Sequence, residues 1–230
     1  MEHLKNNSFI LKLAIFATGF AGIVAEYVLS TLATYFIGNS EFQWTMIVSL
    51  MLFCMGLGSR LSKLFKTNLI RNFLLLELSL SLIVAFSSVL VYTLAAVSSY
   101  YDIVIYFLSM LVGLLIGLEI PLVVRINEEY EDLKTNISSI LEKDYYGSLL
   151  GGVFFAFIGL PILGLTYTPF ILGLINFFVA CMVFYRFKGK MVKNQLKTML
   201  TMMTVVFMIL AAGMSFTDSI ITWGEQKKYK

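Results

Sequence analysis

Three carboxylates lie inside long apolar runs of the sequence, at Glu26, Glu77 and Glu119. A carboxylate near the centre of a bilayer costs about 2.5–3.5 kcal/mol on insertion scales, so each should face other helices and pair with a cation or a hydroxyl, or carry a proton. The pattern predicts sites for a cation or for protons. The alternative for each residue alone is a protonated glutamate that makes one hydrogen bond between helices.

The depth of each carboxylate follows from its place in its run. Glu26 and Glu119 come about 15–17 residues after their runs begin, which is about 23–26 Å along a helix. Because these two runs cross in opposite directions, we expect the two residues in opposite halves of the membrane. Glu77 lies near the cytoplasmic end of its run, where we expect water and Arg71 or Arg60 to reach it, as in a structural role.

Glycines precede two of the carboxylates at helical spacing. They are Gly19 and Gly22 before Glu26, and Gly113 and Gly117 before Glu119, which Pro121 follows. Small residues let helices approach closely, and a proline in a helix frees a backbone carbonyl. The similar settings predict two three-helix halves related as an inverted repeat.

The elements that must position these residues are membrane helices. Of the 230 residues, 59% are hydrophobic and 13% are charged, with a mean hydropathy of +0.85. This composition excludes a secreted disulfide scaffold, a nucleic-acid-binding domain and a globular enzyme with a water-facing cleft. It predicts an all-α polytopic transmembrane bundle of about seven spans, at residues 9–37, 44–65, 73–97, 103–126, 145–165, 169–187 and 199–216.

The basic residues set the expected orientation. Fourteen of the 17 Lys and Arg residues fall at one side of these spans, which the positive-inside rule makes cytoplasmic. We therefore expect a multi-pass protein of the cell membrane with a cytoplasmic N-terminus, a transmembrane domain at residues 1–217 and a polar tail at 218–230. Seven crossings place the tail outside, whereas a last span lying along the interface returns it to the cytoplasm.

The longest polar stretch, residues 127–144, is predicted to be a cytoplasmic amphipathic loop. Its apolar residues share one face of a short helix; they are Leu133, Ile137, Ile140 and Leu141. The sequence favours a solvated connector, and the alternative is a helix on which a partner protein docks.

Few residues remain for redox, metal or nucleophilic chemistry. Cys54 and Cys181 lie in apolar runs without a Cys-x-x-Cys partner, and His3 is the single histidine. No Ser-His-Asp set, Cys-His pair or metal-ligand cluster occurs, so the sequence predicts no cofactor, no metal and no catalytic residue.

With these motifs in place, the chain resembles the transmembrane region of membrane-bound spermidine synthase-like proteins, the polyamine aminopropyltransferases. The residues that carry the resemblance are Gly19-Phe20-Ala21-Gly22 with Glu26, Gly38-Asn39-Ser40, Gly56-Leu57-Gly58-Ser59, Gly117-Leu118-Glu119-Ile120-Pro121-Leu122 with Arg125, Asp144-Tyr145-Tyr146-Gly147-Ser148-Leu149-Leu150-Gly151-Gly152, Leu160-Pro161-Ile162-Leu163-Gly164-Leu165, and Asn176. The resemblance implies a further Rossmann-like catalytic domain that binds decarboxylated S-adenosylmethionine and a diamine. No residues of that domain can be assigned here, so we expect a membrane module without it, and a non-enzymatic role.

Together these features lead to one hypothesis and two alternatives. The chain binds or moves a polyamine or another cation with Glu26, Glu119 and Glu77, while Asp144 and Arg125 fix helix ends and Tyr145 and Asn39 add ligand contacts. The first alternative is a small proton-coupled transporter unrelated to polyamines. The second is a non-transporting anchor that recruits a cytoplasmic or membrane partner enzyme. The expected partners are thus the lipid bilayer, a polyamine or protons, and such a protein, with no nucleic acid.

Overall fold

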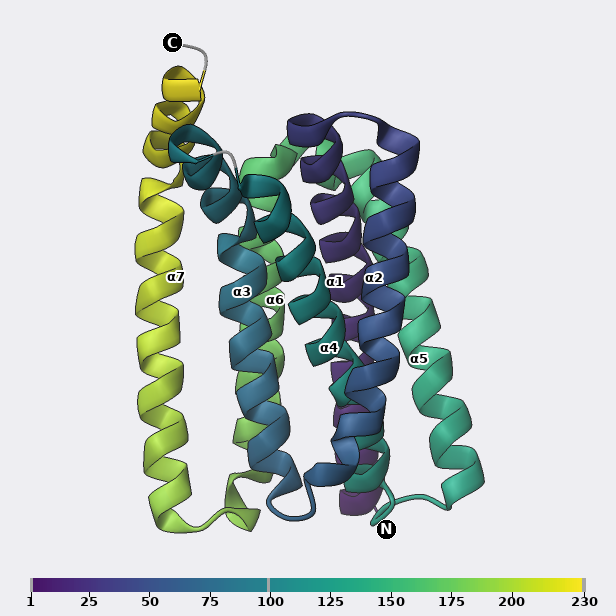
Figure 1. Cartoon of the computed structure of the whole chain (residues 1–230). Helices are drawn as coiled ribbons and strands as arrows, with labels where there is room; N and C mark the ends of the chain where they lie inside the picture. The colour runs from purple at the N-terminus through teal and green to yellow at the C-terminus, as the bar shows by residue number, and fades with distance from the viewer. Residues whose placement is uncertain (1, 99, 229–230) are drawn as a thin grey trace.

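The computed structural model describes residues 2–98 and 100–228, and these form an all-helical bundle (Figure 1). Its seven α-helices are α1 (Glu2–Ile37), α2 (Ser40–Leu61), α3 (Leu69–Val97), α4 (Tyr101–Asn127), α5 (Leu133–Phe154), α6 (Gly164–Phe187) and α7 (Lys193–Lys228). Two short 3-10 turns, Ser62–Leu64 and Lys188–Lys190, and a π-helical segment, Phe155–Leu163, lie between them. No strand occurs in the described ranges, so the predicted all-α class is confirmed.

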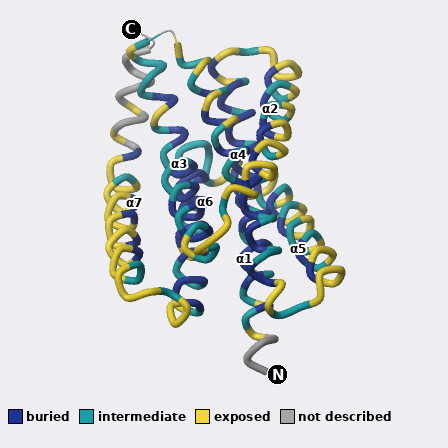
Figure 2. Tube along the Cα trace, turned by 60° about the horizontal axis from the view of Figure 1, so that its bottom comes forward, coloured by how far each residue is buried: buried dark blue, intermediate teal, exposed yellow. Residues whose placement is uncertain are grey.

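Consecutive helices run in alternating directions, and α7 stands at one edge of the bundle (Figure 1). Burial is concentrated along α1, α3, α4 and α6, while α2, α5 and α7 turn exposed sides outward (Figure 2). The largest fully buried side chains include Phe73, Phe170 and Phe187. The core therefore lies between the four inner helices, and side chains exposed on the outer helices are mostly apolar.

The number of spans differs from the prediction. By length and apolarity alone, six stretches of the described chain could cross a membrane: Asn6–Ile37, Ser40–Leu64, Leu69–Val97, Tyr101–Asn127, Leu133–Lys190 and Lys193–Thr217. The predicted spans 145–165 and 169–187 both fall in the fifth stretch, because no non-helical residue separates α5, the π-helical segment and α6. The backbone still changes direction there at Gly164, whose φ of +64° favours glycine. A bundle of seven membrane spans is thus not what the structure shows.

Glycines bring the helices of two pairs into backbone contact. A Cβ atom at Gly113 of α4 would lie 2.7 Å from the Met51 carbonyl oxygen of α2, and one at Gly151 of α5 would lie 2.6 Å from the Phe20 carbonyl oxygen of α1. Such contacts need a residue without a side chain. The α1–α5 and α2–α4 pairs therefore both pack backbone to backbone at glycines, and the inverted repeat stays a prediction.

The predicted amphipathic loop is instead a turn followed by the first part of α5. Asp132 caps this helix, because its carboxylate accepts a hydrogen bond from the Thr135 backbone N–H at 3.1 Å. Asn136 then holds the turn against α4, since its side-chain amide donates to the Val124 carbonyl oxygen at 2.8 Å. The short helix that the sequence predicted is therefore continuous with the longer helix that follows it.

The last helix packs by aromatic contacts and continues through the predicted tail. The rings of Phe177 and Phe207 lie 5.7 Å apart, which joins α6 to α7, and Gly213 of α7 lies against the Phe86 ring of α3. Helix α7 extends to Lys228, so residues 218–228 of the predicted polar tail are helical, and 229–230 lie outside the described residues.

Candidate functional site

A cavity of about 190 Å³ between α1, α2, α4 and α5 brings together three of the predicted site residues. Glu26 of α1 and Asp144 and Tyr145 of α5 line it, and Ser148 adds a hydroxyl. The rest of the wall is largely apolar and includes Met51, Leu52, Met55 and Ile116. We call this cavity the outer pocket.

The close approach of α5 to α1 places Asp144 at the outer pocket. A Cβ atom at Gly19 would lie 2.6 Å from the Asp144 backbone oxygen and 2.7 Å from its carboxylate Oδ1. The Ser148 hydroxyl donates to the Gly19 carbonyl oxygen at 3.2 Å, one turn further along α5. Glycine at position 19 is therefore what lets the Asp144 carboxylate rest against α1.

Glu119 lies behind the outer pocket, in a second cavity of about 10 Å³ that we call the inner cavity. Asn176 of α6 and Thr18 of α1 also line it, and the Thr18 hydroxyl donates to the Ile15 carbonyl oxygen of its own helix at 3.1 Å. Gly22 and Ile116 line both cavities. The two cavities are thus neighbours, separated by the contact between α1 and α4.

Glu26 and Glu119 lie on opposite sides of that contact. Glu26 follows Gly22 by four residues, and Glu119 follows Ile116 by three. Because α1 and α4 are antiparallel, the two carboxylates are offset by about 10 Å along the helix axes at 1.5 Å per residue. The two carboxylates are thus displaced toward opposite ends of the bundle, and their predicted place in opposite halves of a membrane stays a prediction.

The prediction for Glu77 is wrong. Its side chain is 0% exposed, and neither carboxylate oxygen has a hydrogen-bond partner, so water and the guanidinium groups of Arg60 and Arg71 do not reach it. Helix α3 packs against both α4 and α6. These two helices cover Glu77, although Glu77 lies near the end of α3 where we expected access to water. Glu77 interacts electrostatically with Glu119, and Glu119 does so with Asp144.

The arrangement is a series of carboxylates from four helices with no cationic side chain among them. The ion pairs in the described residues join Lys12 to Glu131, Lys143 to Glu142 and Lys190 to Glu129, all outside this series. An unpaired buried carboxylate costs several kcal/mol. Chemically the site therefore suits a cation, although no group of three His, Cys, Asp or Glu in the described chain could hold a metal ion.

Two predicted site residues lie away from this series. The Arg125 guanidinium donates to the Phe65 carbonyl oxygen at 2.8 Å and to the Ser62 carbonyl oxygen at 2.7 Å, so it holds the loop after α2 against the end of α4. Asn39 is the N-cap of α2, where its Oδ1 accepts from the Phe42 N–H at 3.3 Å. The structure brings neither to the outer pocket.

Polar residues of the site that the chemical argument did not single out are Thr18, Ser148 and Asn176. Asn176 is 3% exposed, and its Oδ1 has no hydrogen-bond partner. A single asparagine in an apolar run indicates that its side chain faces neighbouring helices, so Asn176 could have been predicted from the sequence. A serine or threonine gives no such signal, because its hydroxyl can bond to the backbone of its own helix.

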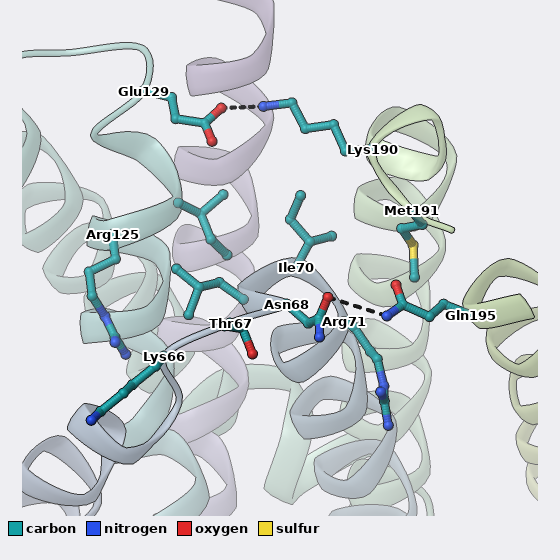
Figure 3. Close-up of a pocket in the computed structure, with 12 residues that line it drawn as sticks. Lys66, Thr67, Asn68, Ile70, Arg71, Arg125, Glu129, Lys190, Met191 and Gln195 are labelled. Atoms are coloured by element: carbon teal, nitrogen blue, oxygen red, sulfur yellow. Dashed lines mark hydrogen bonds and ion pairs between the residues drawn. The ribbon is translucent and has the colours of Figure 1, made fainter. Parts of the chain in front are cut away.

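A third cavity, of about 240 Å³, opens at the end of the bundle where α2 meets α3 (Figure 3). It is lined by the cations Lys66, Arg71, Arg125 and Lys190 together with Glu129. Lys190 pairs with Glu129, and the charged ends of Lys66 and Arg71 point to different sides in the close-up. The cations do not converge on one point, so this cavity is a weaker candidate than the carboxylate series.

Comparisons with known proteins find similarity to named enzymes. The chain is 46% identical over 222 residues to polyamine aminopropyltransferase 2 of Aquifex aeolicus, covering 95% of this chain and 43% of that protein. It is 33% identical over 219 residues to polyamine aminopropyltransferase of Leptospira interrogans, covering 95% of this chain and 44% of that protein. The chain therefore spans less than half the length of these relatives. No family model matches the chain. No solved structure matches it either.

These relatives correct the predicted role. We had expected a membrane module apart from the enzyme, with a non-enzymatic role, but the proteins that align with 95% of the chain are named for an enzymatic activity. Because an aminopropyltransferase is an enzyme, these names support an enzymatic activity in place of the transporter and the anchor alternatives. The names do agree with the expected relation to polyamines. Over nearly its whole length, the chain is thus similar to polyamine aminopropyltransferases.

Proposed function

We propose that the chain takes part in the transfer of an aminopropyl group to a polyamine, and that the outer pocket binds the ammonium groups of the amine. The similarity to polyamine aminopropyltransferases over 95% of the chain supports the activity. The observation that carries the binding site is the convergence of Glu26 and Asp144, from different helices, on one cavity.

The chemistry of the pocket matches that of a linear amine. An ammonium group is a donor of three hydrogen bonds, and carboxylates accept the stronger, charge-assisted kind. The methylene groups of the amine are apolar, as are Met51, Leu52 and Met55 in the wall. Tyr145 and Ser148 add hydroxyl oxygens at the same cavity.

We also propose that the bundle lies in the cell membrane with the N-terminus in the cytoplasm. Six stretches have the length and apolarity to cross. Most Lys and Arg residues lie near the start of α1 or in and beside the α2–α3, α4–α5 and α6–α7 connections, and these segments meet at one end of the bundle (Figure 1).

A binding experiment tests the pocket. Isothermal titration of the purified chain with 1,4-diaminobutane should show binding, and the Glu26→Gln, Asp144→Asn double variant should weaken it roughly a hundredfold, because two charge-assisted bonds at about 1.5 kcal/mol each are lost. Glu142→Gln is the matched control, since Glu142 lies two residues from Asp144 and is paired with Lys143 outside the pocket. Equal binding by wild type and the double variant would exclude the site.

A separate assay tests the activity. The chain would be supplied with decarboxylated S-adenosylmethionine and 1,4-diaminobutane, and the aminopropylated amine would be measured by mass spectrometry. Product formation is expected if the chain carries the activity of its relatives. Amine binding without any product would contradict transfer by this chain while leaving the amine site in place.

A further inference from the structure

We propose that the inner cavity is a second ammonium subsite, which receives the far end of a diamine or polyamine whose near end lies at Glu26 and Asp144. The inference rests on the proposed amine site and extends it inward to Glu119. It assigns a ligand class, linear amines with at least two ammonium groups, and it separates them from monoamines.

The first support is that the inner cavity presents unpaired acceptors. Glu119 Oε1 and Asn176 Oδ1 are both buried and have no hydrogen-bond partner, and the two residues are 1% and 3% exposed. Buried polar atoms in proteins nearly always have a hydrogen-bond partner, so two unpaired polar atoms in one cavity indicate a site for a ligand. The Asn176 Oδ1 atom is an acceptor, and Glu119 Oε1 is one in the ionised carboxylate, so a cationic donor would satisfy both atoms.

The second support is the size of the cavity. Its volume of about 10 Å³ is close to the smallest space that holds one water molecule. An ammonium group is about as large as a water molecule and brings three N–H donors together with a positive charge. The cavity is thus large enough for one ammonium group and too small for a larger head group.

The third support is the wall between the two cavities. Gly22 and Ile116 line both, and a Cβ atom at Gly22 would lie 3.2 Å from the Ile116 Cδ1 atom. The wall at this point is therefore the Ile116 side chain, which faces a glycine. Rotation of the Ile116 side chain would leave an apolar passage that suits the methylene groups joining two ammonium groups.

Glu77 strengthens the charge of the inner end. Its two carboxylate oxygens are buried without a hydrogen-bond partner, and it interacts electrostatically with Glu119. Two ionised carboxylates repel each other in an apolar core, and a cation bound beside them would offset that repulsion. No Lys or Arg side chain of the described residues pairs with either one.

The experiment compares a diamine with a monoamine on the purified chain. Titration of wild type should show 1,4-diaminobutane binding at least roughly tenfold more tightly than butylamine, because one more charge-assisted contact forms. In Glu119→Gln, diamine affinity should fall to near that of butylamine, while butylamine affinity stays as in wild type. Thermal melting of each variant checks that it is folded.

A second variant tests the passage without changing a charge. In Gly22→Ala, the nearest atoms to the added methyl group belong to the Ile116 side chain and not to a backbone, with Cδ1 closest at 3.2 Å, so the fold should hold while the passage narrows. Diamine affinity should fall severalfold, and by clearly more than butylamine affinity, because Gly22 lines the passage as well as the outer pocket. Leu57→Ala, at a position 37% exposed on the outside of α2, is the control for a general effect of substitution.

The outcomes separate the two proposals. If wild type binds neither amine, the proposed amine site itself fails. If it binds both amines equally and Glu119→Gln changes nothing, the inner subsite is overturned and the outer one stands. If Glu119→Gln or Gly22→Ala weakens both amines to the same extent, Glu119 acts through the outer pocket or the fold, and the inner subsite is again overturned.

Discussion

At the scale of single residues, the molecule separates paired from unpaired carboxylates. Glu131 is paired, since the Lys12 ammonium donates to it at 2.6 Å and the Ser139 hydroxyl at 3.4 Å. Glu77 and Glu119 have no cationic partner and lie in the core. The first kind holds α1 to the turn before α5, and the second kind is left free for a ligand.

The Lys12–Glu131 pair gives a pH prediction. Partial burial raises the pKa of Glu131, but the hydrogen bonds from Lys12 and Ser139 outweigh it, so the pKa lies below its ordinary value. The pair therefore stabilises the fold above the pKa of the unfolded chain, about 4.3, and this contribution is lost as the pH falls through the lower pKa of the folded state.

The test is the variant Glu131→Gln followed by thermal melting across pH. At pH 7 it should be destabilised by about 0.5–1 kcal/mol, as for a partly exposed ion pair, and the difference from wild type should vanish in acid as Glu131 becomes protonated. Glu142→Gln is the control, because its partner Lys143 is its neighbour in sequence and both are exposed. A difference that persists unchanged at pH 3 would contradict the role of the charge.

At the scale of helices, the sequence predicted most elements but not their ends. Apolar runs marked the helices correctly because each run is the part that packs, whereas helical hydrogen bonding continues into polar sequence. Helix α5 begins at Leu133, twelve residues before the apolar run at 145, since Asp132 caps it there. The burial of Glu77 also escaped prediction, because it depends on which helices cover α3 and not on α3 itself.

The glycine pattern did carry information about pairing. It predicted close helix contacts, and the contacts of Gly19 and Gly113 bear this out. The glycine pattern could not predict that α1 pairs with α5, because a glycine indicates close helix packing but does not identify the partner helix. The meeting of Glu26 with Asp144, residues distant in sequence, follows from that pairing and so needed the structure.

The α2–α4 contact gives a prediction at this scale. In Gly113→Ala, the new Cβ atom would lie 2.7 Å from the Met51 carbonyl oxygen, and the backbones must separate, which we expect to cost about 1–3 kcal/mol and to lower the melting temperature by several degrees. Gly56→Ala on α2 is the control, since no atom lies within 4 Å of its new Cβ. Equal melting temperatures for the two variants would argue against tight packing at Gly113.

At the scale of the whole molecule, the two ends of α7 lie at opposite ends of the bundle. Helix α7 begins at the end of the bundle where α1 begins, and its described end lies at the opposite end of the bundle (Figure 1). Seven alternating helices require this arrangement, and α7 is continuous over 36 residues. A last helix lying flat along the membrane surface does not fit this packing, because α7 runs beside α3.

The proposed membrane topology then predicts where each end of α7 can be labelled. In a Cys54→Ala, Cys181→Ala background, a cysteine placed at Thr222 should react with an impermeant maleimide on intact cells. A cysteine at Asn194, exposed at the other end of the same helix, should react only after the cells are opened. Labelling of both positions in intact cells, or of neither, would contradict a membrane-crossing α7. Labelling of Asn194→Cys alone would indicate the opposite orientation, with the basic end of the bundle outside the cell. That result would contradict the positive-inside rule, on which the proposed cytoplasmic N-terminus rests.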